Sequence, residues 1–287
     1  MQIIMTKARQ ILAIITFVLT LCISNANAQP IGILMVHYGT NNDARRTATI
    51  DHLNSLVASS FGECTVAEAY AAPSVIKSLN KRGIQKLTIA SALDSLKARG
   101  CSRIVVQSTM LLSGVMTDMI NNAVKQAEVQ FDKILVAKPL LSGVSECHEV
   151  VSMIDSHLRA SKMLSDSNTQ VVLVGHGSDS PADATYSQID YMLKDEGKAN
   201  WHVGTIEGYP TLQSTKRLLQ SNKSKHVILV PLLYIAGNHL YNDINGEWRR
   251  QLEAAGYTVD VVTEGLGDMP EIQQLIIRNI NQLINQL

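Results

Sequence analysis

The sequence lacks the motifs of several common enzyme classes. It contains no GxxxxGK[ST] loop for nucleotide phosphates, no complete GxGxxG after a strand and no GxSxG nucleophile motif. Ser178 stands within Gly-Ser-Asp-Ser, which leaves a serine hydrolase as a weak alternative. Charged residues make up only 17%, and the 25 basic residues equal the 25 acidic ones. This balance argues against a partnership with nucleic acid or with an anionic membrane surface.

Cysteine is scarce, and its spacing matches no known framework. Beyond residue 28 the chain keeps Cys64, Cys101 and Cys147, and none of them belongs to a CxxC pair. The spacing therefore argues against a thiolate zinc or iron–sulfur site, and an odd number is not a disulfide framework. We expect small, mostly buried residues, with one disulfide left open.

Long apolar runs are absent except near the N-terminus. Lys7 and Arg9 precede an apolar run over residues 11–23, and small residues follow at 26–28. This order of basic, apolar and small residues is typical of a secretory signal peptide. We therefore predict a signal peptide over residues 1–28, cleavage after Ala28 and a periplasmic location.

Two other fates of this segment remain open. It could stay as an uncleaved N-terminal anchor, or Cys22 could carry a lipid, although the small residues of a lipoprotein site do not precede it. No later segment is long and apolar enough to span a bilayer, so we expect no membrane span after cleavage.

The rest of the chain alternates short apolar runs with longer amphipathic stretches. Hydrophobic residues make up 46% of the sequence, which is enough for a sizeable core. Strands that alternate with helices indicate parallel sheets covered on both faces. Strands are expected at residues 31–37, 64–69, 103–112 and 133–138, and again at 170–174, 201–206, 226–235 and 258–263, with an amphipathic closing helix over 270–287.

The pattern of the first half recurs in the second. Gly39-Thr40 and Gly177-Ser178 each close a first strand, and two apolar segments of equal length, 103–114 and 226–237, each end on a small residue and glycine. We predict an α/β fold of two similar domains that face each other across a cleft. The expected divisions are an N-terminal domain at 29–143, a linker with a helix at 144–169, a C-terminal domain at 170–265 and a closing helix at 266–287.

Three residues with metal-ligand chemistry follow strands of the second half. His176, Glu207 and His239 each stand at or just past the end of a different predicted strand. Ligands of open parallel sheets bind beyond the carboxyl ends of the strands. Two imidazoles and a carboxylate suit a divalent ion such as Co²⁺, Ni²⁺, Fe²⁺ or Zn²⁺, and three ligands leave coordination positions open. The sequence therefore predicts a shared metal site.

Each of the three also has a structural explanation of its own. His176 could be incidental to a tight Gly-His-Gly turn, Glu207 could cap the next helix, and His239 could be a solvent-facing loop residue. Their common placement at strand ends favours the shared site.

The other histidines show no partner pattern. Aligning Gly39-Thr40 with Gly177-Ser178 places Tyr38, and not His37, opposite His176. Side chains alternate along a strand, so His37 should point the other way and is not expected to be a ligand. Helix surfaces or strand ends are expected for His52, His148, His157, His202 and His226.

Three segments of the second half form a recognisable set: VGHGS at 174–178, VGTIEGYP at 203–210 and VPLLYIAGNHLYND at 230–243. With these as its strongest parts, and over nearly its whole length after residue 28, the chain resembles the CbiK-type sirohydrochlorin cobaltochelatases, which are class II, ATP-independent chelatases. AAG at 254–256 and EGLG at 264–267 are also similar to the family. These segments are specific as a set, although none is specific alone.

The resemblance implies an activity and roles for the three residues. The family's metal ligands fall on His176, Glu207 and His239, and its proposed proton acceptor falls on His176. The expected reaction is the insertion of Co²⁺, or alternatively Ni²⁺ or Fe²⁺, into a sirohydrochlorin-type tetrapyrrole, as in anaerobic cobalamin synthesis, without an organic cofactor. Some members are exported, and some of those bind haem at a subunit interface. The sequence leaves the oligomeric state open, a homo-oligomer included.

The first half departs from the family pattern. Family members carry an acidic pair after the glycine that corresponds to Gly114, whereas Val115 and Met116 stand here. The alternative to a chelatase is therefore a periplasmic protein that binds a tetrapyrrole or a metal without turnover. Met116 and His239 follow equivalent glycines by two residues, so the pair could ligate one haem from opposite sides. Packing of Met116 in the cleft wall is the simpler interpretation.

Overall fold

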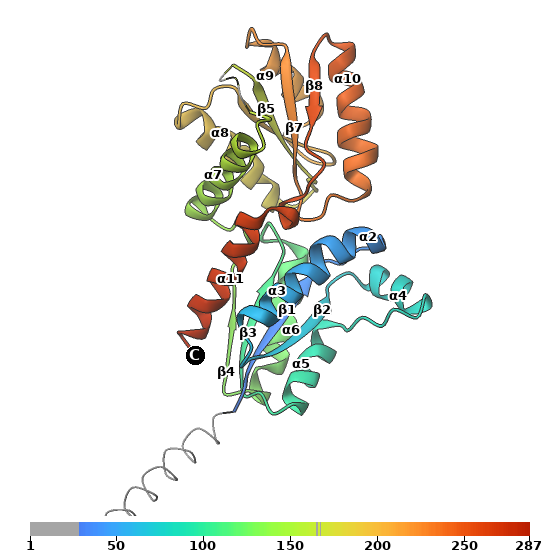
Figure 1. Ribbon diagram of the computed structural model, residues 1–287, viewed down its shortest axis with the longest axis vertical. Coiled ribbons are helices and arrows are strands. Elements are labelled where there is room, and N and C mark those ends of the chain that lie inside the picture. The colour runs from blue at the N-terminus through green and yellow to red at the C-terminus, as the bar shows by residue number, and fades with distance from the viewer. Residues whose placement is uncertain (1–28, 165, 167) are drawn as a thin grey trace, which may run out of the picture.

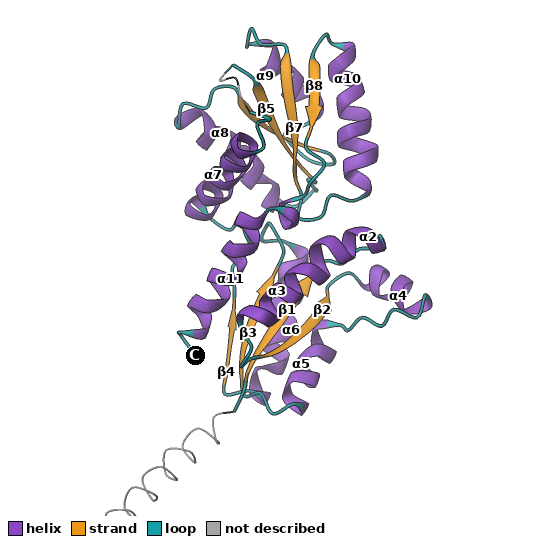
Figure 2. Ribbon diagram, in the orientation of Figure 1, coloured by secondary structure: helices purple, strands orange, loops and turns teal. Residues whose placement is uncertain are grey.

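The computed structural model describes residues 29–164, 166 and 168–287. The predicted signal peptide lies outside these residues. The described chain forms two four-stranded parallel sheets with the strand orders β2-β1-β3-β4 and β6-β5-β7-β8. Helices flank both sheets, and the carboxyl ends of the two sheets point toward the boundary between them (Figures 1 and 2). The predicted α/β fold of two similar sheet domains is confirmed.

The first sheet and its helices occupy the first half of the chain. Its strands are β1 Ile31–His37, β2 Thr65–Tyr70, β3 Arg103–Ser108 and β4 Lys133–Val136. Its helical segments are α2 Asp43–Arg45, η1 Arg46–Asp51, α3 His52–Ser60, α4 Pro73–Lys81, α5 Ile89–Ala98, α6 Val115–Ala127 and η2 Glu128–Gln130.

The second sheet repeats this arrangement. Its strands are β5 Gln170–Gly175, β6 Trp201–Thr205, β7 His226–Leu232 and β8 Thr258–Val261. The remaining helical segments are α7 Val144–Ala160, η3 Pro181–Asp183, α8 Ala184–Asp195, α9 Leu212–Gln220, η4 Leu240–Trp248, α10 Arg249–Ala254, η5 Leu266–Asp268 and α11 Pro270–Ile284.

The central strands hold each half together. All six residues of β5 are buried, and in β1 only Ile31 is partly exposed. Strands that are buried on both faces need continuous apolar sequence, and IGILMVH and QVVLVG approach this requirement. One face of each sheet packs under its own helices, while the other faces join in one cluster that runs through both halves.

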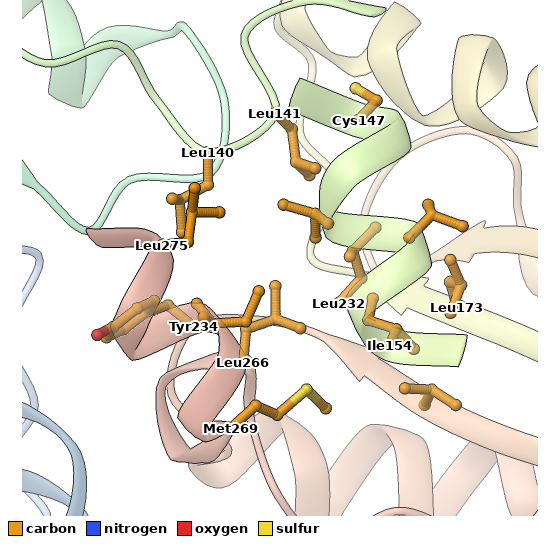
Figure 3. Close-up of a cluster of buried hydrophobic side chains, with 14 of the residues drawn as sticks. Leu140, Leu141, Cys147, Ile154, Leu173, Leu232, Tyr234, Leu266, Met269 and Leu275 are labelled. Atoms are coloured by element: carbon orange, nitrogen blue, oxygen red, sulfur yellow. The ribbon is translucent and has the colours of Figure 1, made fainter. Parts of the chain in front are cut away.

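Two helices cross between the halves. Helix α7 follows the first sheet in sequence, but its residues Cys147 and Ile154 lie near Leu173 and Leu232 of the second sheet (Figure 3). Helix α11 follows the second sheet and contacts β3 and α3 of the first (Figure 1). This exchange ties the two halves into one hydrophobic core and keeps their facing edges together.

Several predicted strands end earlier than expected, and the difference is largest, three or four residues, for β3 and β7. The apolar segments at 103–112 and 226–235 leave their sheets at Ser108 and Leu232. Beyond these points the chain is held by single main-chain hydrogen bonds to the loops that follow β4 and β8. The Leu111 carbonyl accepts from the Leu141 N–H, and the Leu233 carbonyl accepts from the Leu266 N–H. The apolar residues that follow β3 and β7 therefore line the space between the halves. Because they face the other half, they are as hydrophobic as strand residues.

The three described cysteines are free, with Cys101 and Cys147 buried and Cys64 partly exposed. They pack as small apolar residues, in keeping with the expectation from their spacing. Among the described residues, no helix has both the length and the apolar character needed to cross a membrane.

Candidate metal centre

Three neighbouring strands of the second sheet bring the predicted ligands to one edge. His176 directly follows β5, Glu207 stands two residues after β6, and His239 lies in the loop after β7. The imidazole rings of His176 and His239 meet edge to face with their centroids 4.6 Å apart. The Glu207 Oε2 atom lies 3.8 Å from Nδ1 of His176. The structure therefore gathers all three side chains in one place.

Glycine makes the close approach of two of these loops possible. A Cβ at Gly177 would lie 2.4 Å from the main-chain nitrogen of Gly208, and Gly177 has a φ of +77°. Because larger residues rarely adopt this conformation, both the turn and the contact require glycine at 177. The Glu207 N–H then donates to the carbonyl of His176 at 2.8 Å, so a hydrogen bond joins the main chains of the two predicted ligands.

Helix α8 and the short helix η3 before it contact the His176 loop and support it. The Asp183 carboxylate accepts hydrogen bonds from the Ser178 N–H at 2.7 Å and from the Ser178 hydroxyl at 2.9 Å. The Tyr186 ring packs under Gly175, where a Cβ would lie 2.2 Å from it. Burial raises the pKa of Tyr186 to about 12, so this phenol stays neutral as it supports the loop.

His239 stands at the start of the π-helix η4. The ring donates its Nδ1–H to the Asp243 carboxylate at 2.8 Å. Gly246 allows the wide turns of this helix, because a Cβ there would lie 2.9 Å from the carbonyl oxygen of Tyr241. Such π-turns are rare and occur frequently at functional sites.

Both imidazoles are held through the same ring nitrogen. His176 donates its Nδ1–H to the carbonyl of Gly177 at 2.7 Å, as His239 does to Asp243. A carbonyl or carboxylate oxygen can only accept, so Nδ1 must carry the proton in both rings. In the neutral form of each ring, Nε2 then keeps its lone pair, and that is the form in which histidine binds a metal ion.

Two cavities flank His176 between the halves. We call the larger one, of about 540 Å³, the interdomain cavity. The smaller one, of about 320 Å³, is the side cavity. The interdomain cavity is lined by Tyr38, Gly39, Thr40, Asn41, Asn42, Val75, Thr109, Met110, Leu111, His176, Leu233, Tyr234, Ile235, Gly237, Asn238 and His239. The side cavity is lined by Met110, Leu111, Leu112, Gly114, Val115, Met116, His176, Gly177, Ser178, Ser180, Ala182, Asp183, Tyr186, Leu232, Leu233 and Tyr234.

The electrostatics of this edge suit a cation. Neither cavity is lined by a Lys or Arg side chain among the described residues. Glu207 and Asp243 form ion pairs only with His176 and His239 in the described part of the chain. Two carboxylates without a Lys or Arg partner leave a negative potential that a divalent ion can neutralise.

The predicted ligands do not yet enclose a common point. In the part of the chain that the structure describes, no group of three or more His, Cys, Asp or Glu side chains is arranged to hold a metal ion. Glu207 lies nearest to Nδ1 of His176, and that nitrogen is already bonded to Gly177. The shared ion therefore stays a prediction that requires a movement of Glu207.

The first half supplies walls to this site. Tyr38, the residue aligned with His176, lines the interdomain cavity opposite the two histidines. Met116 lines the side cavity beside His176 and packs against the core of the first half, while His239 lines the interdomain cavity. The structure places Met116 as the packing interpretation expects, and Val115 is 65% exposed.

His37 lies away from the site, as strand alternation predicts. The ring is fully buried, with Nε2 3.0 Å from Asn54 Oδ1 and Nδ1 3.2 Å from Thr109 Oγ1. Burial lowers the pKa of His37, so the ring stays neutral. Both ring nitrogens are engaged, which leaves none for a metal ion.

The sequence did not identify the apolar walls of the cavities. Leu111, Leu233 and Ile235 appeared to belong to strands, and the structure places them in loops beside His176. Their segments are longer than the mean strand of about five or six residues, and this was the available indication.

Known proteins with the same architecture include metal chelatases. The profile of the cobalt chelatase (CbiK) family matches residues 31–285. A sirohydrochlorin cobaltochelatase of Salmonella typhimurium is 25% identical over 258 residues, which cover 88% of this chain and 96% of the relative. The sirohydrochlorin cobaltochelatase CbiKC of Nitratidesulfovibrio vulgaris is 25% identical over 264 residues, which cover 89% and 91%.

Solved structures agree on the fold. SirB from Bacillus subtilis with Fe³⁺ superposes with a TM-score of 0.68 and 18% identity, over 88% of this chain and 95% of SirB. The sirohydrochlorin chelatase SirB from Bacillus subtilis subspecies spizizenii in complex with cobalt gives a TM-score of 0.62 at 18% identity, over 88% and 94%. The match to the family profile spans nearly all described residues of both halves, and the chain therefore belongs to the cobalt chelatase (CbiK) family.

Proposed function

We propose that this protein is an ATP-independent chelatase that inserts Co²⁺ into sirohydrochlorin. Family membership and the two cobaltochelatase relatives support this activity. The observation that carries it is the gathering of His176, Glu207 and His239 on three adjacent strand ends, beside an uncharged cavity between the halves.

The metal ion is a substrate of this reaction. Co²⁺ binds to Nε2 of His176 and of His239, the two nitrogens with free lone pairs, and to the Glu207 carboxylate. Glu207 has a 58% exposed side chain, so a change of rotamer toward the imidazoles meets little resistance. Three protein ligands leave open positions at which the ring nitrogens of the macrocycle can bind. Ni²⁺ and Fe²⁺ should compete, because such a donor set does not select by affinity.

The macrocycle lies in the interdomain cavity. Leu233 and Ile235 from one half and Tyr38 and Val75 from the other offer apolar and aromatic contacts to a flat ring. This placement brings the ring nitrogens next to His176 and His239, which line the same cavity. Holding the ion and the macrocycle next to each other lowers the entropic part of the barrier to their reaction.

Insertion also requires the removal of two pyrrole protons. His176 is the proposed acceptor of one proton, which its Nε2 takes up after this nitrogen has released the ion, and the other proton passes to solvent. As each pyrrole N–H bond breaks, the nitrogen keeps the electron pair and donates it to Co²⁺. No redox step occurs, and the departing protein ligands leave the ion to the ring.

The direct test is anaerobic incubation of the protein with sirohydrochlorin and Co²⁺ in the absence of nucleotide. The absorbance of the macrocycle should change at a rate far above that of the spontaneous reaction. Glu207→Gln should lower this rate strongly, whereas His148→Ala should not, because His148 pairs with Glu196 outside both cavities. A rate equal to the spontaneous one would reject the proposed activity.

We further propose that the protein acts in the periplasm after removal of residues 1–28. The support is the basic, apolar and small-residue order of that segment. Mass spectrometry of protein from its native host should find a chain that begins at Gln29. A chain that retains Met1 would show that this segment is not a cleaved signal peptide.

A further inference from the structure

The two imidazoles of the candidate site are anchored by groups of different charge. His239 donates its Nδ1–H to a carboxylate, Asp243, at 2.8 Å. His176 donates its Nδ1–H to a neutral carbonyl, that of Gly177, at 2.7 Å, and the Glu207 carboxylate, which lies 3.8 Å from this nitrogen, is itself a proposed ligand that turns toward the ion. A carboxylate behind an imidazole raises its basicity as a metal ligand and fixes the orientation of its ring. The two histidines are therefore unequal as ligands, although the sequence presents them alike.

The charge of Asp243 is directed at His239. The two residues are four positions apart at the start of η4, so they share one face of the helix. No Lys or Arg pairs with Asp243 in the described chain, and His239 is its partner. The carboxylate therefore acts on the imidazole without competition from a neighbouring cation.

We propose that Asp243 is a positioning residue that holds Nε2 of His239 toward the ion and makes His239 the tighter of the two imidazole ligands. The inference rests on the proposed function. It adds that the ion remains on His239 until the ring nitrogens have bound it, while His176 is the ligand that is released first. Asp243 contacts neither the ion nor the macrocycle.

A purely structural role for Asp243 makes a different prediction. Asp243 is an acidic residue in the first turn of η4, where it also interacts favourably with the helix dipole. If this were its only role, Asp243→Ala would lower the melting temperature and leave the Co²⁺ affinity of the folded protein unchanged. Metal affinity therefore separates the two roles.

The chain contains a matched control pair. Asp260 and His226 are also joined by a contact of 2.8 Å, but His226 begins β7 and lies at the opposite end of the sheet from the site. Calorimetric titration with Co²⁺ should show an affinity about 10- to 100-fold lower for Asp243→Ala than for wild type. Asp260→Asn should match wild type, and Asp243→Glu should restore part of the affinity.

A double-mutant cycle tests whether Asp243 acts through His239. In a His239→Ala background, Asp243→Ala should cause no further loss of Co²⁺ affinity. In a His176→Ala background it should lower the affinity by the same factor as in wild type. In the chelation assay, Asp243→Ala should raise the KM for Co²⁺ about 10-fold or more and change kcat less than about threefold. An Asp243→Ala variant with wild-type affinity, or an equal loss in both backgrounds, would overturn the inference.

The same titrations separate this inference from the proposed function. Wild-type protein that binds no Co²⁺ would reject the metal site itself, and the role of Asp243 with it. Wild-type protein that binds and inserts Co²⁺, combined with an unaffected Asp243→Ala variant, would reject the role of Asp243 alone.

Discussion

Strands β1 and β5 occupy the same central position in their sheets, yet Tyr38 follows one and His176 follows the other. The contrast continues along each edge. Two residues after β2 stands the buried Ala72, whereas Glu207 stands two residues after β6. The strand ends of the two halves face each other across the interdomain cavity. The second half places candidate metal ligands there, whereas the first half places apolar and aromatic side chains.

This difference shows how two domains of the same fold can take different roles in one site. Metal ligands must converge within a few tenths of an ångström, and the loops of the second half are tied together by the Glu207–His176 main-chain bond. The first half has the equivalent main-chain hydrogen bond, from the Ala72 N–H to the Tyr38 carbonyl at 3.2 Å, but Tyr38 and Val75 offer aromatic and apolar area for a flat ring instead of imidazole or carboxylate ligands. The three candidate ligands therefore all lie in the second half, and none of them depends on the side chains of Val115 and Met116.

The largest effect should come from substituting His176, and the matching substitution of Tyr38 at the equivalent strand end should have little effect. His176→Ala should lower kcat/KM for Co²⁺ insertion by about 10²- to 10⁴-fold, because it removes both a ligand and the proton acceptor. Tyr38→Phe should stay within about threefold of wild type, since the ring and its contacts remain. Equal losses in steady-state assays of the two variants would contradict the division between the halves.

The buried histidine of the second half should make stability depend on pH. Burial, helped by Lys194, lowers the pKa of His202 to about 4, while Asp190 opposes the shift. The unfolded chain takes up this proton near pH ~6.5 but the folded protein only near about 4, so stability is complete above ~6.5 and is lost as pH falls through that window.

The expected loss is about 3 kcal/mol between about pH 7 and about pH 4. Urea unfolding at the two pH values measures it, and His202→Gln should remove this part of the dependence. His37→Gln provides the matching measurement for the first half, where burial also lowers the pKa of the histidine. A pH dependence that is unchanged in His202→Gln would show that other groups cause it.

The two positive-φ glycines at the equivalent strand ends sharpen the comparison. Gly39 and Gly177 both need this conformation, so alanine at either should cost about 1–3 kcal/mol of folding stability or more. Gly39→Ala collides with the Tyr70 ring, whereas Gly177→Ala collides with the main chain of Gly208 next to Glu207. Only Gly177→Ala should therefore also abolish Co²⁺ binding in the folded protein, as calorimetry below the melting temperature can establish.

The smallest effect should follow from restoring acid to the first half. Val115 and Met116 begin α6 beside the side cavity, and Met116 is partly buried. The double variant Val115→Glu/Met116→Glu should raise the insertion rate by a few-fold, up to about 10-fold, because an acidic group can steer the ion or accept a proton. Parallel assays across about pH 5.5 to 8.5 should show the gain at each pH, and a slower variant would indicate that the apolar wall itself matters.

Much of the fold was predictable because its strongest determinant is local. The apolar run of β5 and the amphipathic pattern of α9 identify their elements directly, and the repeated order of elements predicts two parallel sheets. The ends of β3 and β7 were not predictable from hydrophobicity. Residues that face the other half are as apolar as residues in a sheet, so only the tertiary structure separates them.

The candidate site shows the same limit. Strand-end position was enough to choose His176, Glu207 and His239, because the topology brings the ends of parallel strands together. The proposed role of Asp243 and the hydrogen bond between the main chains of Glu207 and His176 depend on side-chain and loop geometry. No spacing rule encodes this geometry, and it appears only when the loops are folded against each other.

The most direct measurement is a crystal structure with Co²⁺ and anomalous diffraction data collected at the cobalt edge. One anomalous peak should lie about 2.0–2.2 Å from Nε2 of His176, Nε2 of His239 and a carboxylate oxygen of Glu207, with no peak of similar height at the facing edge of the first half. A cobalt peak beside Met116 or Tyr38, or none within reach of the two histidines, would contradict the assignment of the metal site to the second half.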